Sequence, residues 1–483
     1  MARITKLVKG VQNHWKKSLF GVAAITYGIN YANEKYKINQ LMRNYCAEAS
    51  IYGDRTQPAN QPFPKVIVIL NPVADRKSAA DTFEQYCAPI LNLGGLSIDI
   101  VKTDSEGHAR RYVEELETLP QAILCAGGDG TLSEIVTGLF RRPPHLNESH
   151  PVIGVLPVGR QSTFGEKLFN FTNSSELQRV QGLADASLAI VLGNVVPKDV
   201  MKIELIDAES NVKAKPVYAL SSFEWSAFTD AFNRRDRYWY VGGLRDYVTF
   251  IFNAFDDSIT WNCAAKITYT EPCAGCSNCY VTQKKSEAKS ANRRWWSGFI
   301  PSFRLGSSQS NAVKSTDYSK VQNANCANVT SIECDSAGII VSTENIKSKP
   351  DEQIPHLSLK LIKGQSGFGF IGDGWDRLNK KKINIDQNIA IRSVEIHPKI
   401  SIKEENLKLE SKNSENEQSN SESTPNQQQQ DESNAEEKKP KSEADKSKAE
   451  EEQEKFFYID HESYEVKPIR ITLLPKLVNF YST

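Results

Sequence analysis

The segment Gly127-Gly128-Asp129-Gly130-Thr131 has the residue types and the place in the chain of a phosphate-binding loop. It follows an apolar run over 122–126, and after it apolar residues recur at the spacing of one buried helix face. Glycines let a backbone approach phosphate closely, and the amides and dipole of a helix N-terminus attract it. An acid inside such a loop repels phosphate unless a cation lies between them or the acid takes a proton. Both interpretations indicate phosphoryl transfer from a magnesium nucleotide.

Thr131 and Glu134 in the same segment also have the spacing of a capping box at a helix N-terminus. The glycines would then only form a tight turn. We favour the nucleotide site, with which the capping role is compatible, because a predicted strand and a predicted helix flank the loop. No Gly-Lys-Ser/Thr follows, so the loop is not a Walker loop, and its glycines do not have the dinucleotide-binding spacing.

The elements that must position this loop alternate between strands and helices. We predict strands over 65–70, 97–103, 122–126 and 151–157, and helices over 82–91 and 106–119. This alternation predicts a parallel α/β sheet that binds ligands at the carboxyl ends of its strands. Asn71 and Thr103 follow two of the strands, so we expect them on one rim with the glycine-rich loop.

These motifs resemble those of the lipid kinases of the diacylglycerol and sphingosine kinase family. The resemblance rests on the glycine-rich loop with Glu134, on Asn71-Pro72, and on residues 101–109 around Thr103. Residues 458–465 are similar to the family's Asp-Gly-Glu segment. Further segments are similar to the acylglycerol kinase branch of the family, and they cover residues 13–17, 92–95 and 237–242.

The chain departs from the family's pattern at three places. Residues 73–77 lack the glycine that often follows Asn-Pro, and His461 replaces the Gly of Asp-Gly-Glu. The family's Pro-x-Gly-Thr-x-Asn reads Pro-Val-Gly-Arg-Gln-Ser over 157–162, so only Gly159 is carried over as a nucleotide contact. Asp129 and the two acids beside His461 are retained. The departures therefore affect the hold on the nucleotide more than the reaction class.

The resemblance implies an ATP- and magnesium-dependent kinase that phosphorylates monoacylglycerol and diacylglycerol to lysophosphatidate and phosphatidate. Three carboxylates are the expected catalytic residues, namely Asp129, Asp460 and Glu462. We expect Glu462 to act as the base and Asp129 to hold magnesium through water, with Asp129 as the alternative base. The expected nucleotide contacts are Asn71, Thr103, Gly127, Gly128, Asp129, Gly130, Thr131, Glu134 and Gly159.

Two alternatives stay open for the function. A sphingosine or ceramide kinase would carry the same nucleotide motifs, and no motif of the C-terminal half specifies the lipid. The resemblance to the acylglycerol kinase branch also implies a location at the mitochondrial inner membrane, facing the intermembrane space. It further implies association with the carrier protein translocase of that membrane, in which the chain would be a structural subunit.

We assign the catalytic domain to residues 61–199. The C-terminal half differs from it in the length and spacing of its apolar segments. Short β-branched segments separated by turn signals cover 200–206, 216–221, 265–269, 339–342, 357–362, 390–396 and 469–474. This pattern predicts an antiparallel, β-sandwich-like lipid-substrate domain over 200–400 and 456–483. The cleft between the two domains is the expected substrate site.

Two polar inserts interrupt the second domain. Residues 402–455 contain almost no large apolar side chain and are predicted to be disordered, and their charges mostly cancel. The insert over 280–328 interleaves arginines with aromatic residues between Arg293 and Arg304. Such a segment suits a membrane surface with anionic lipids, although Trp295 and Trp296 could instead pack on the domain.

Nine cysteines are present, an odd number, so at least one is unpaired if the others form disulfides. Cys273, Cys276 and Cys279 have ligand-like spacing, and one more cysteine could complete a metal site. The residues that could do so are Cys263, Cys326 and Cys334. Because the sequence has no second Cys-x-x-Cys or histidine pair, we favour plain thiols or a disulfide over a metal, and we assign no metal site there.

Residues 1–60 form a basic N-terminal segment with a candidate membrane anchor. Five basic residues precede the first acid, Glu34, as in a mitochondrial targeting sequence. An apolar run of about 15 residues over 18–32 follows, which is short for a membrane span. It could span the membrane or lie on its surface. The chain as a whole has 59 basic and 59 acidic residues, so no excess charge attracts nucleic acid.

Overall fold

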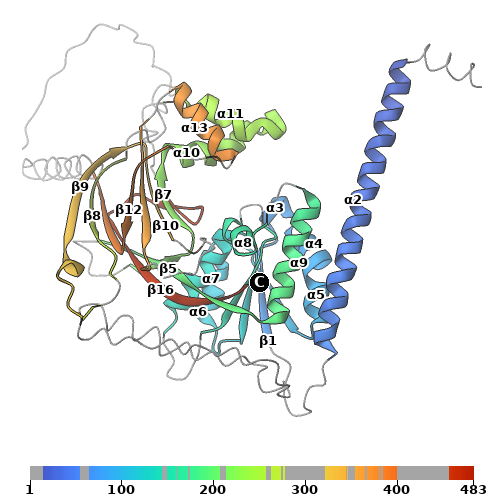
Figure 1. Ribbon diagram of the computed structural model, residues 1–483, viewed down its shortest axis with the longest axis horizontal. Coiled ribbons are helices and arrows are strands. Elements are labelled where there is room, and N and C mark those ends of the chain that lie inside the picture. Colours follow the sequence, from blue (N-terminus) through green and yellow to red (C-terminus); the bar gives the residue numbers. More distant parts are fainter. Residues whose placement is uncertain are drawn as a thin grey trace, which may run out of the picture. The chain divides into compact units, whose positions relative to one another are not determined.

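The computed structural model describes residues 15–54, 65–143, 150–159, 162–171, 175–206, 214–256, 263–273, 276–277, 321–343, 345, 354–364, 367–379, 381, 384–399 and 456–482 (Figure 1). They divide into two compact units between Val200 and Met201. Among the described residues, the first unit holds those up to Val200 and from Pro475 onward, and the second holds the rest. Arg160, Gln161, Cys279, the predicted insert over 402–455 and residues 280–320 of the predicted insert over 280–328 lie outside the described residues.

A parallel sheet forms the centre of the first unit. β1 (Lys65–Leu70) pairs with β2 (Ser97–Lys102) and with β3 (Ala122–Ala126), and β3 pairs with β4 (Val152–Leu156). Every residue of β3 is buried, as expected for a central strand covered on both faces. The end of β16 (Ile469–Tyr481) adds a further parallel pairing to β4, between Phe480 and Ile153. The predicted parallel α/β fold is therefore confirmed.

The helices of the first unit lie between these strands in the chain. They are α3 (Ala74–Lys77), α4 (Ala79–Thr82), the π-helical η1 (Phe83–Cys87), α5 (Ala88–Leu93), α6 (His108–Glu115), α7 (Asp129–Arg141), α8 (Thr163–Leu168) and α9 (Glu176–Leu192). The helix predicted over 82–91 begins earlier, at Ala79, and includes a π turn. α7 begins inside the predicted loop, at Asp129, which changes the roles of the residues that follow it.

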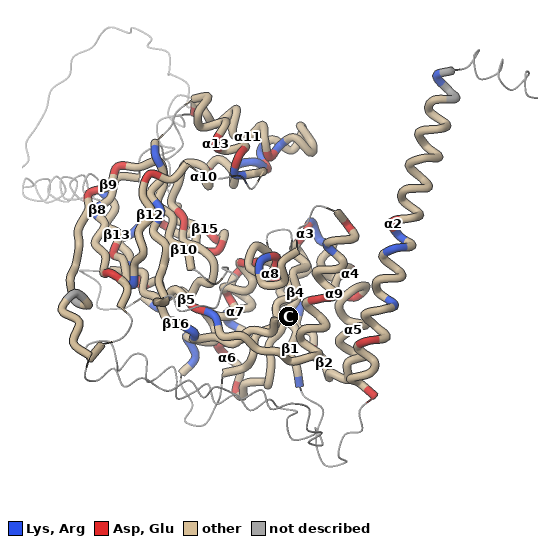
Figure 2. Tube along the Cα trace, viewed as in Figure 1, with Lys and Arg blue, Asp and Glu red and all other residues tan. Residues whose placement is uncertain are grey.

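The long helix α2 (Trp15–Gly53) has two different halves. Its C-terminal half packs on α5 and α9, where Ile38 and Ala49 are buried and Tyr45 donates a 2.5 Å hydrogen bond to Asp185. Its N-terminal half exposes apolar side chains from Leu19 to Tyr31, over a stretch that Figure 2 shows without charged residues. No helix among the described residues is both long enough and apolar enough to cross a membrane.

Two antiparallel sheets form the second unit. The first has the strand order β12 (Ile385–Ile391), β11 (Leu357–Ile362), β10 (Gly338–Thr343), β7 (Ser222–Ser226), β14 (Phe456–Ile459) and β15 (Glu462–Glu465). The second contains the first part of β16, β13 (Ser393–Pro398), β8 (Cys263–Thr270) and β9 (Val329–Ser336), with β5 (Val195–Leu205) and β6 (Val217–Ala219) alongside. Side chains of both sheets, including Trp225, Leu359, Ile267 and Ile396, share one buried core. The predicted β-sandwich-like class is confirmed.

Two details of the prediction for this unit are wrong. The single strand predicted over 390–396 is two strands, β12 and β13, which are separated at Arg392. The prediction also lacked five helical segments that the structure describes, which are α10 (Ala227–Asn233), η2 (Arg234–Leu244), α11 (Arg245–Asn253), η4 (Ala324–Ala327) and α13 (Phe368–Leu378). In Figure 1, α10, α11 and α13 lie together, and they bury Phe228, Phe250 and Phe370 in a second core.

Candidate nucleotide and catalytic site

The ends of four parallel strands bring the predicted nucleotide contacts of the first unit together. The backbone amide of Asn71 donates to Ala126 at 3.0 Å, and that of Thr103 donates to Leu70 at 2.9 Å. Past the end of β4, the Gly159 amide donates to the Gly127 carbonyl at 3.1 Å. Asn71, Thr103, residues 127–131 and Gly159 thus form one continuous edge of the sheet, which we name the strand-end rim.

Two glycines allow the loops of this rim to approach one another. A Cβ atom on Gly159 would lie 2.8 Å from the Gly128 nitrogen and 2.9 Å from the Gly127 oxygen. A Cβ atom on Gly127 would lie 2.8 Å from the Thr131 hydroxyl oxygen. Neither position therefore tolerates a side chain without movement of the loop, which explains the residue type at both.

The N-terminus of α7 has the features of an anion-binding site. Gly128 is the N-cap residue in an extended conformation, and it provides no side chain to bind the first amides. The first amides of any helix have no acceptor within the helix, and the helix dipole adds a partial positive charge there. The arrangement is suited to holding a phosphate group.

The side chain of Asp129 is bound to the backbone of α8. Its two carboxylate oxygens accept hydrogen bonds from the amides of Thr163, at 2.9 Å, and Phe164, at 3.1 Å. The residue is only 3% exposed. Asp129 therefore joins the start of α7 to the start of α8, a structural role that the sequence did not reveal.

Glu134 does not form the predicted capping box with Thr131. Because α7 begins at Asp129, Thr131 is the third residue of the helix and Glu134 lies nearly one turn further on. The Glu134 carboxylate accepts hydrogen bonds from the amides of Gly107, at 2.9 Å, and Arg110, at 3.3 Å, and so caps the neighbouring helix α6. The Thr131 hydroxyl instead accepts a 3.2 Å hydrogen bond from Asn71. Glu134 therefore holds the start of α6, which follows Thr103 in the chain, through its hydrogen bonds to Gly107 and Arg110.

A buried thiol lies beneath the glycine-rich loop. Burial raises the pKa of Cys125, the fourth residue of β3, and the charges of Asp129 and Glu134 raise it further. The thiol therefore stays protonated and neutral at physiological pH. It acts as a small apolar side chain under the loop and not as a nucleophile.

Sequence reasoning missed a group of basic residues beside the rim. Arg179 of α9 pairs with Asp75 at 2.5 Å and donates to the Val158 carbonyl at 3.2 Å, and so links the segments after β1 and β4.

The segment after β1 has an unusual backbone conformation. Asp75, Arg76 and Lys77 are left-handed, with φ of 49°, 57° and 72°. This is the segment that lacks the family's glycine, and a positive φ costs a non-glycine residue about 1–2 kcal/mol. The missing glycine and the two exposed cations, Arg76 and Lys77, are the features of the sequence from which these basic residues could have been predicted.

Asp460 in the second unit is held by backbone amides in the same manner as Asp129. Its carboxylate accepts hydrogen bonds of 2.8–2.9 Å from the amides of Leu220, Ser221 and Ser222, and it is 1% exposed. Asp460 and His461 form the two-residue turn between β14 and β15, with φ of 46° and 73°. Two positive φ values are typical of a type I′ turn, whose second position favours glycine. Asp460 therefore joins this hairpin to residues 220–222.

Glu462 is the first residue of β15 and is more accessible than Asp129 or Asp460. It is partly exposed, and it accepts a 3.0 Å hydrogen bond from the Tyr464 hydroxyl. Of the three predicted catalytic carboxylates, Asp129 lies in the first unit, whereas Asp460 and Glu462 lie in the second. A partly exposed carboxylate bound by a side-chain hydroxyl can exchange this partner for a substrate hydroxyl more readily than one bound by buried amides.

The strand-end rim lies in the part of the chain that matches a known protein family. Residues 65–203, which include all four strands of the rim, match the family model of the diacylglycerol kinase catalytic domain. The chain is 37% identical over 269 residues to the mitochondrial acylglycerol kinase of Mus musculus, a match covering 56% of this chain and 61% of that protein. The match to the Xenopus laevis protein is 34% over 257 residues, covering 53% and 58%.

More distant similarities reach other lipid kinases. Human sphingosine kinase 2 is 23% identical over 183 residues, which cover 38% of this chain and 27% of that protein. The crystal structure of a diacylglycerol kinase from Bacillus anthracis str. Sterne has a TM-score of 0.41 and 16% identity, and covers 88% of this chain and 98% of that one. The chain thus spans about three-fifths of the length of the curated acylglycerol kinases that it matches, 61% for the mouse protein.

Proposed function

We propose that this chain, which carries a diacylglycerol kinase catalytic domain over residues 65–203, is an ATP-dependent lipid kinase. Its acceptors are monoacylglycerol and diacylglycerol, and its products are lysophosphatidate and phosphatidate. The observation that carries the proposal is the strand-end rim, where two glycines let the loops pack closely around the N-terminus of α7, a place suited to phosphate. The identity to acylglycerol kinases supports the choice of lipid.

The nucleotide phosphates bind at the amides of α7 in this proposal. Gly127 and Gly128 allow their close approach, while Asn71 and Thr103 line the rim on the neighbouring strand ends. Arg76 and Lys77 are exposed after β1 and supply positive charge that stabilises the phosphoryl group during its transfer. The departure from the family's glycine in this segment thus adds cations to the rim.

Magnesium is the cofactor that this chemistry requires. When bound, it neutralises charge on the nucleotide phosphates and on the transferring phosphoryl group. The residues present fit an indirect site: Asp129, the first residue of α7 on the strand-end rim, would hold the ion through water.

Glu462 acts as the general base that takes the proton of the lipid hydroxyl. Asp129 and Asp460 are less suited, because each is buried and has both oxygens bound to backbone amides. A carboxylate is basic enough for this step, because phosphoryl transfer depends mostly on positioning and charge stabilisation. Asp129 and Asp460 then contribute by holding α8 and the β14–β15 turn in place.

A patch of exposed aromatic residues in the second unit supports action at a lipid surface. We name it the aromatic patch; its residues are 53% to 85% exposed and comprise Trp239, Tyr240, Phe252, Phe255 and Phe368. Phe255 contacts Phe368 with ring centroids 6.2 Å apart, and Phe252 stacks on Tyr238 at 5.1 Å, so the rings belong to neighbouring elements. η2 also carries three arginines, and Figure 2 shows positive charge beside α11. Exposed rings next to cations suit the interface of a membrane that contains anionic lipids.

The mitochondrial inner membrane is the proposed location. The matched relatives are named mitochondrial, and the basic N-terminal segment has the composition of a targeting sequence. The exposed apolar half of α2 can lie in the membrane interface or against a membrane protein. A structural role beside the carrier translocase would use that half, whereas catalysis uses the strand-end rim.

The test is a transfer assay with purified full-length chain, labelled ATP, magnesium and vesicles that carry one lipid each. We expect label in monoacylglycerol and diacylglycerol, and loss of transfer in Gly159→Ala because the added methyl group strikes the glycine-rich loop. Gly364→Ala is the matched control, since nothing lies within 4 Å of its added carbon. Label in sphingosine or ceramide alone would contradict the acceptor, and no transfer to any lipid would contradict the kinase.

A further inference from the structure

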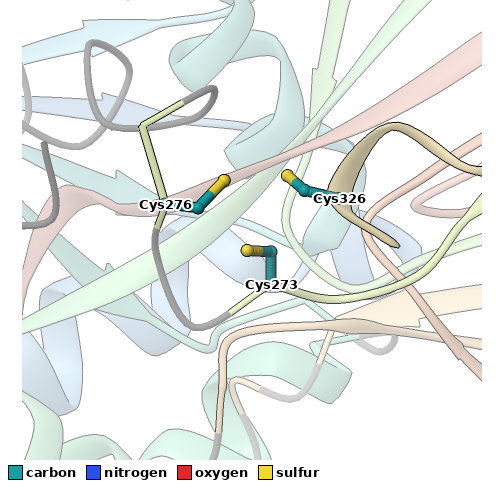
Figure 3. Close-up of side chains that lie close together, drawn as sticks. All are labelled: Cys273, Cys276 and Cys326. Carbon is teal, nitrogen blue, oxygen red and sulfur yellow. The ribbon is translucent and has the colours of Figure 1, made fainter. Parts of the chain in front are cut away.

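Three cysteines meet at one end of the β8–β9 hairpin in the second unit. The last residue pair of this hairpin is Thr270 with Val329. Cys273 and Cys276 follow β8, and Cys326 comes just before β9, so residues far apart in the sequence become neighbours. Their sulfur atoms all lie within 4.8 Å of one another, and in Figure 3 the three side chains point toward a common centre.

The environment of the cluster separates it from ordinary core cysteines. All three side chains are buried and form a small cluster of their own, apart from the main core of the unit. No disulfide joins any of the cysteines that the structure describes. By contrast, Cys263 and Cys334 belong to the main core. The meeting of three sulfur atoms in one buried place therefore requires its own explanation.

Polar donors point at two of these sulfur atoms. The Asn323 side-chain amide donates to Cys273 Sγ at 3.3 Å, and the Arg392 guanidinium donates to Cys326 Sγ at 3.4 Å. Donors of this kind orient the sulfur ligands of metal sites. The positive charge of Arg392 would also offset the net negative charge of three thiolates around a divalent ion. The surroundings thus suit a metal held by sulfur ligands.

We propose that Cys273, Cys276 and Cys326 bind a zinc ion. In tetrahedral sites the Zn–S distance is about 2.3 Å, which places neighbouring ligand sulfurs about 3.8 Å apart. That spacing falls within the 4.8 Å limit observed for all three pairs. Soft thiolate ligands select zinc over magnesium or calcium, so this site is chemically distinct from the magnesium of the kinase reaction. The three described ligands leave the fourth position of the tetrahedron to a further donor.

The ion would add a link between segments that are already neighbours. The amide of Ser277 donates to the Val321 carbonyl at 2.8 Å, so the two ends of the segment 278–320 are already adjacent. Arg392, the residue between β12 and β13, binds Thr270 and Leu473 through its backbone. A zinc ion would fix Cys273, Cys276 and Cys326 to one another beside this junction of strands, and metal binding of this kind adds to the free energy of folding.

Metal analysis of the full chain, purified without chelator, tests the proposal. We expect about one zinc ion per chain, in keeping with a structural thiolate site. The triple variant Cys273→Ser, Cys276→Ser, Cys326→Ser should lose the zinc, whereas Cys46→Ser, a change on α2, should keep it. Wild-type chain that neither contains zinc nor takes it up would overturn the site. Equal zinc content in the triple variant would also overturn it.

Cobalt substitution keeps the proposal testable if the triple variant does not fold. Wild-type chain stripped of metal and given cobalt(II) should show the strong near-ultraviolet absorption of thiolate-to-metal charge transfer, which oxygen or nitrogen ligands do not give. Absence of this absorption would contradict thiolate ligation. Mass spectrometry under non-reducing conditions adds a second decision, because a disulfide between any two of the three cysteines would exclude the zinc site.

Discussion

The carboxylate of Asp129 accepts a hydrogen bond of 2.9 Å from the backbone amide of Thr163, the first residue of α8. The acid at the centre of the glycine-rich loop is therefore also the cap of a second helix, thirty-four positions further along the chain. Chemistry at the loop and stability of the rim depend on the same side chain. Substitution of Asp129 should thus affect both properties, which separates this site from one whose acid serves catalysis alone.

Asp129→Asn should lower both the stability and the activity of the chain. The amide group of asparagine offers one oxygen acceptor to two backbone donors, so one buried donor loses its partner at a cost of about 1–3 kcal/mol. Chemical denaturation should show a lower midpoint, and phosphoryl transfer at saturating ATP should fall at temperatures where the variant is folded. Asp99→Asn, on the exposed face of β2, is the control and should change neither. Unchanged stability in Asp129→Asn would contradict the capping role.

Glu462→Gln should reduce kcat with little change in the KM for ATP. Glutamine keeps the size of the side chain and can still interact with the Tyr464 hydroxyl, but it cannot take a proton. A loss in kcat with an unchanged KM indicates a group that acts in the transition state. Steady-state kinetics with diacylglycerol vesicles provide the measurement, and Glu465→Gln, an exposed change on the same strand, is the comparison. Full activity in Glu462→Gln would assign the base elsewhere.

His461→Gly should stabilise the chain by about 1 kcal/mol, because glycine adopts a left-handed backbone without steric cost. His461 has a φ of 73° in the β14–β15 turn. The gain would appear as a higher denaturation midpoint with unchanged kinetics, since neither Asp460 nor Glu462 is altered. A lower midpoint would show that the histidine side chain contributes more than its backbone conformation costs. Ser463→Gly, on exposed β15, provides a control for the general effect of glycine.

The local parts of the fold and of the site could be predicted from the sequence. β3 is a continuous apolar run because it is buried on both faces, and its end at Gly127 marks the loop without knowledge of any partner. Asn71 and Thr103 could be placed on the same edge because parallel strands end at one side of a sheet. These features depend on residues adjacent in the chain and on a general rule of topology.

The features that the sequence did not reveal depend on distant partners. Asp460 binds the backbone at Leu220, and their separation is 240 positions. No pattern within either segment indicates this contact. The sequence likewise left Cys326 as one of three candidates for a further metal ligand. The pairing of β8 with β9 brings Cys326 close to Cys273. The capping-box prediction was wrong because α7 begins two residues before Thr131, so that Glu134 binds the start of α6 instead.

The glycines of α13 explain why this helix was not predicted. α13 contains glycines at positions 369, 372 and 374, and glycine in a helix interior costs about 1 kcal/mol relative to alanine. At Gly374 an added Cβ would lie 2.4 Å from the Phe250 ring, so the glycine serves the close packing of α13 on α11. Tertiary packing thus outweighs the weak helix propensity, and propensity alone predicts a loop.

Replacement of Trp239 and Phe368 in the aromatic patch by alanine should weaken binding to vesicles that contain anionic lipid. The two side chains are 74% and 85% exposed, so their removal costs little stability, whereas each contributes apolar area at a membrane interface. Vesicle sedimentation should show a loss of about tenfold or more in affinity, with about 1 kcal/mol or more lost for each ring. Transfer to diacylglycerol in vesicles should fall in parallel.

The control for this prediction is the same assay with a lipid below its aggregation concentration. A variant that only binds membranes poorly should phosphorylate soluble short-chain diacylglycerol at the wild-type rate, because the strand-end rim is unchanged. Ile100→Ala and Val196→Ala remove two exposed apolar side chains outside the aromatic patch and should leave vesicle binding unchanged. Equal vesicle affinity for the aromatic variant and the wild type would show that the patch does not contact the membrane. Equal losses on soluble and vesicle-bound lipid would instead assign these rings to the fold or to the acceptor pocket.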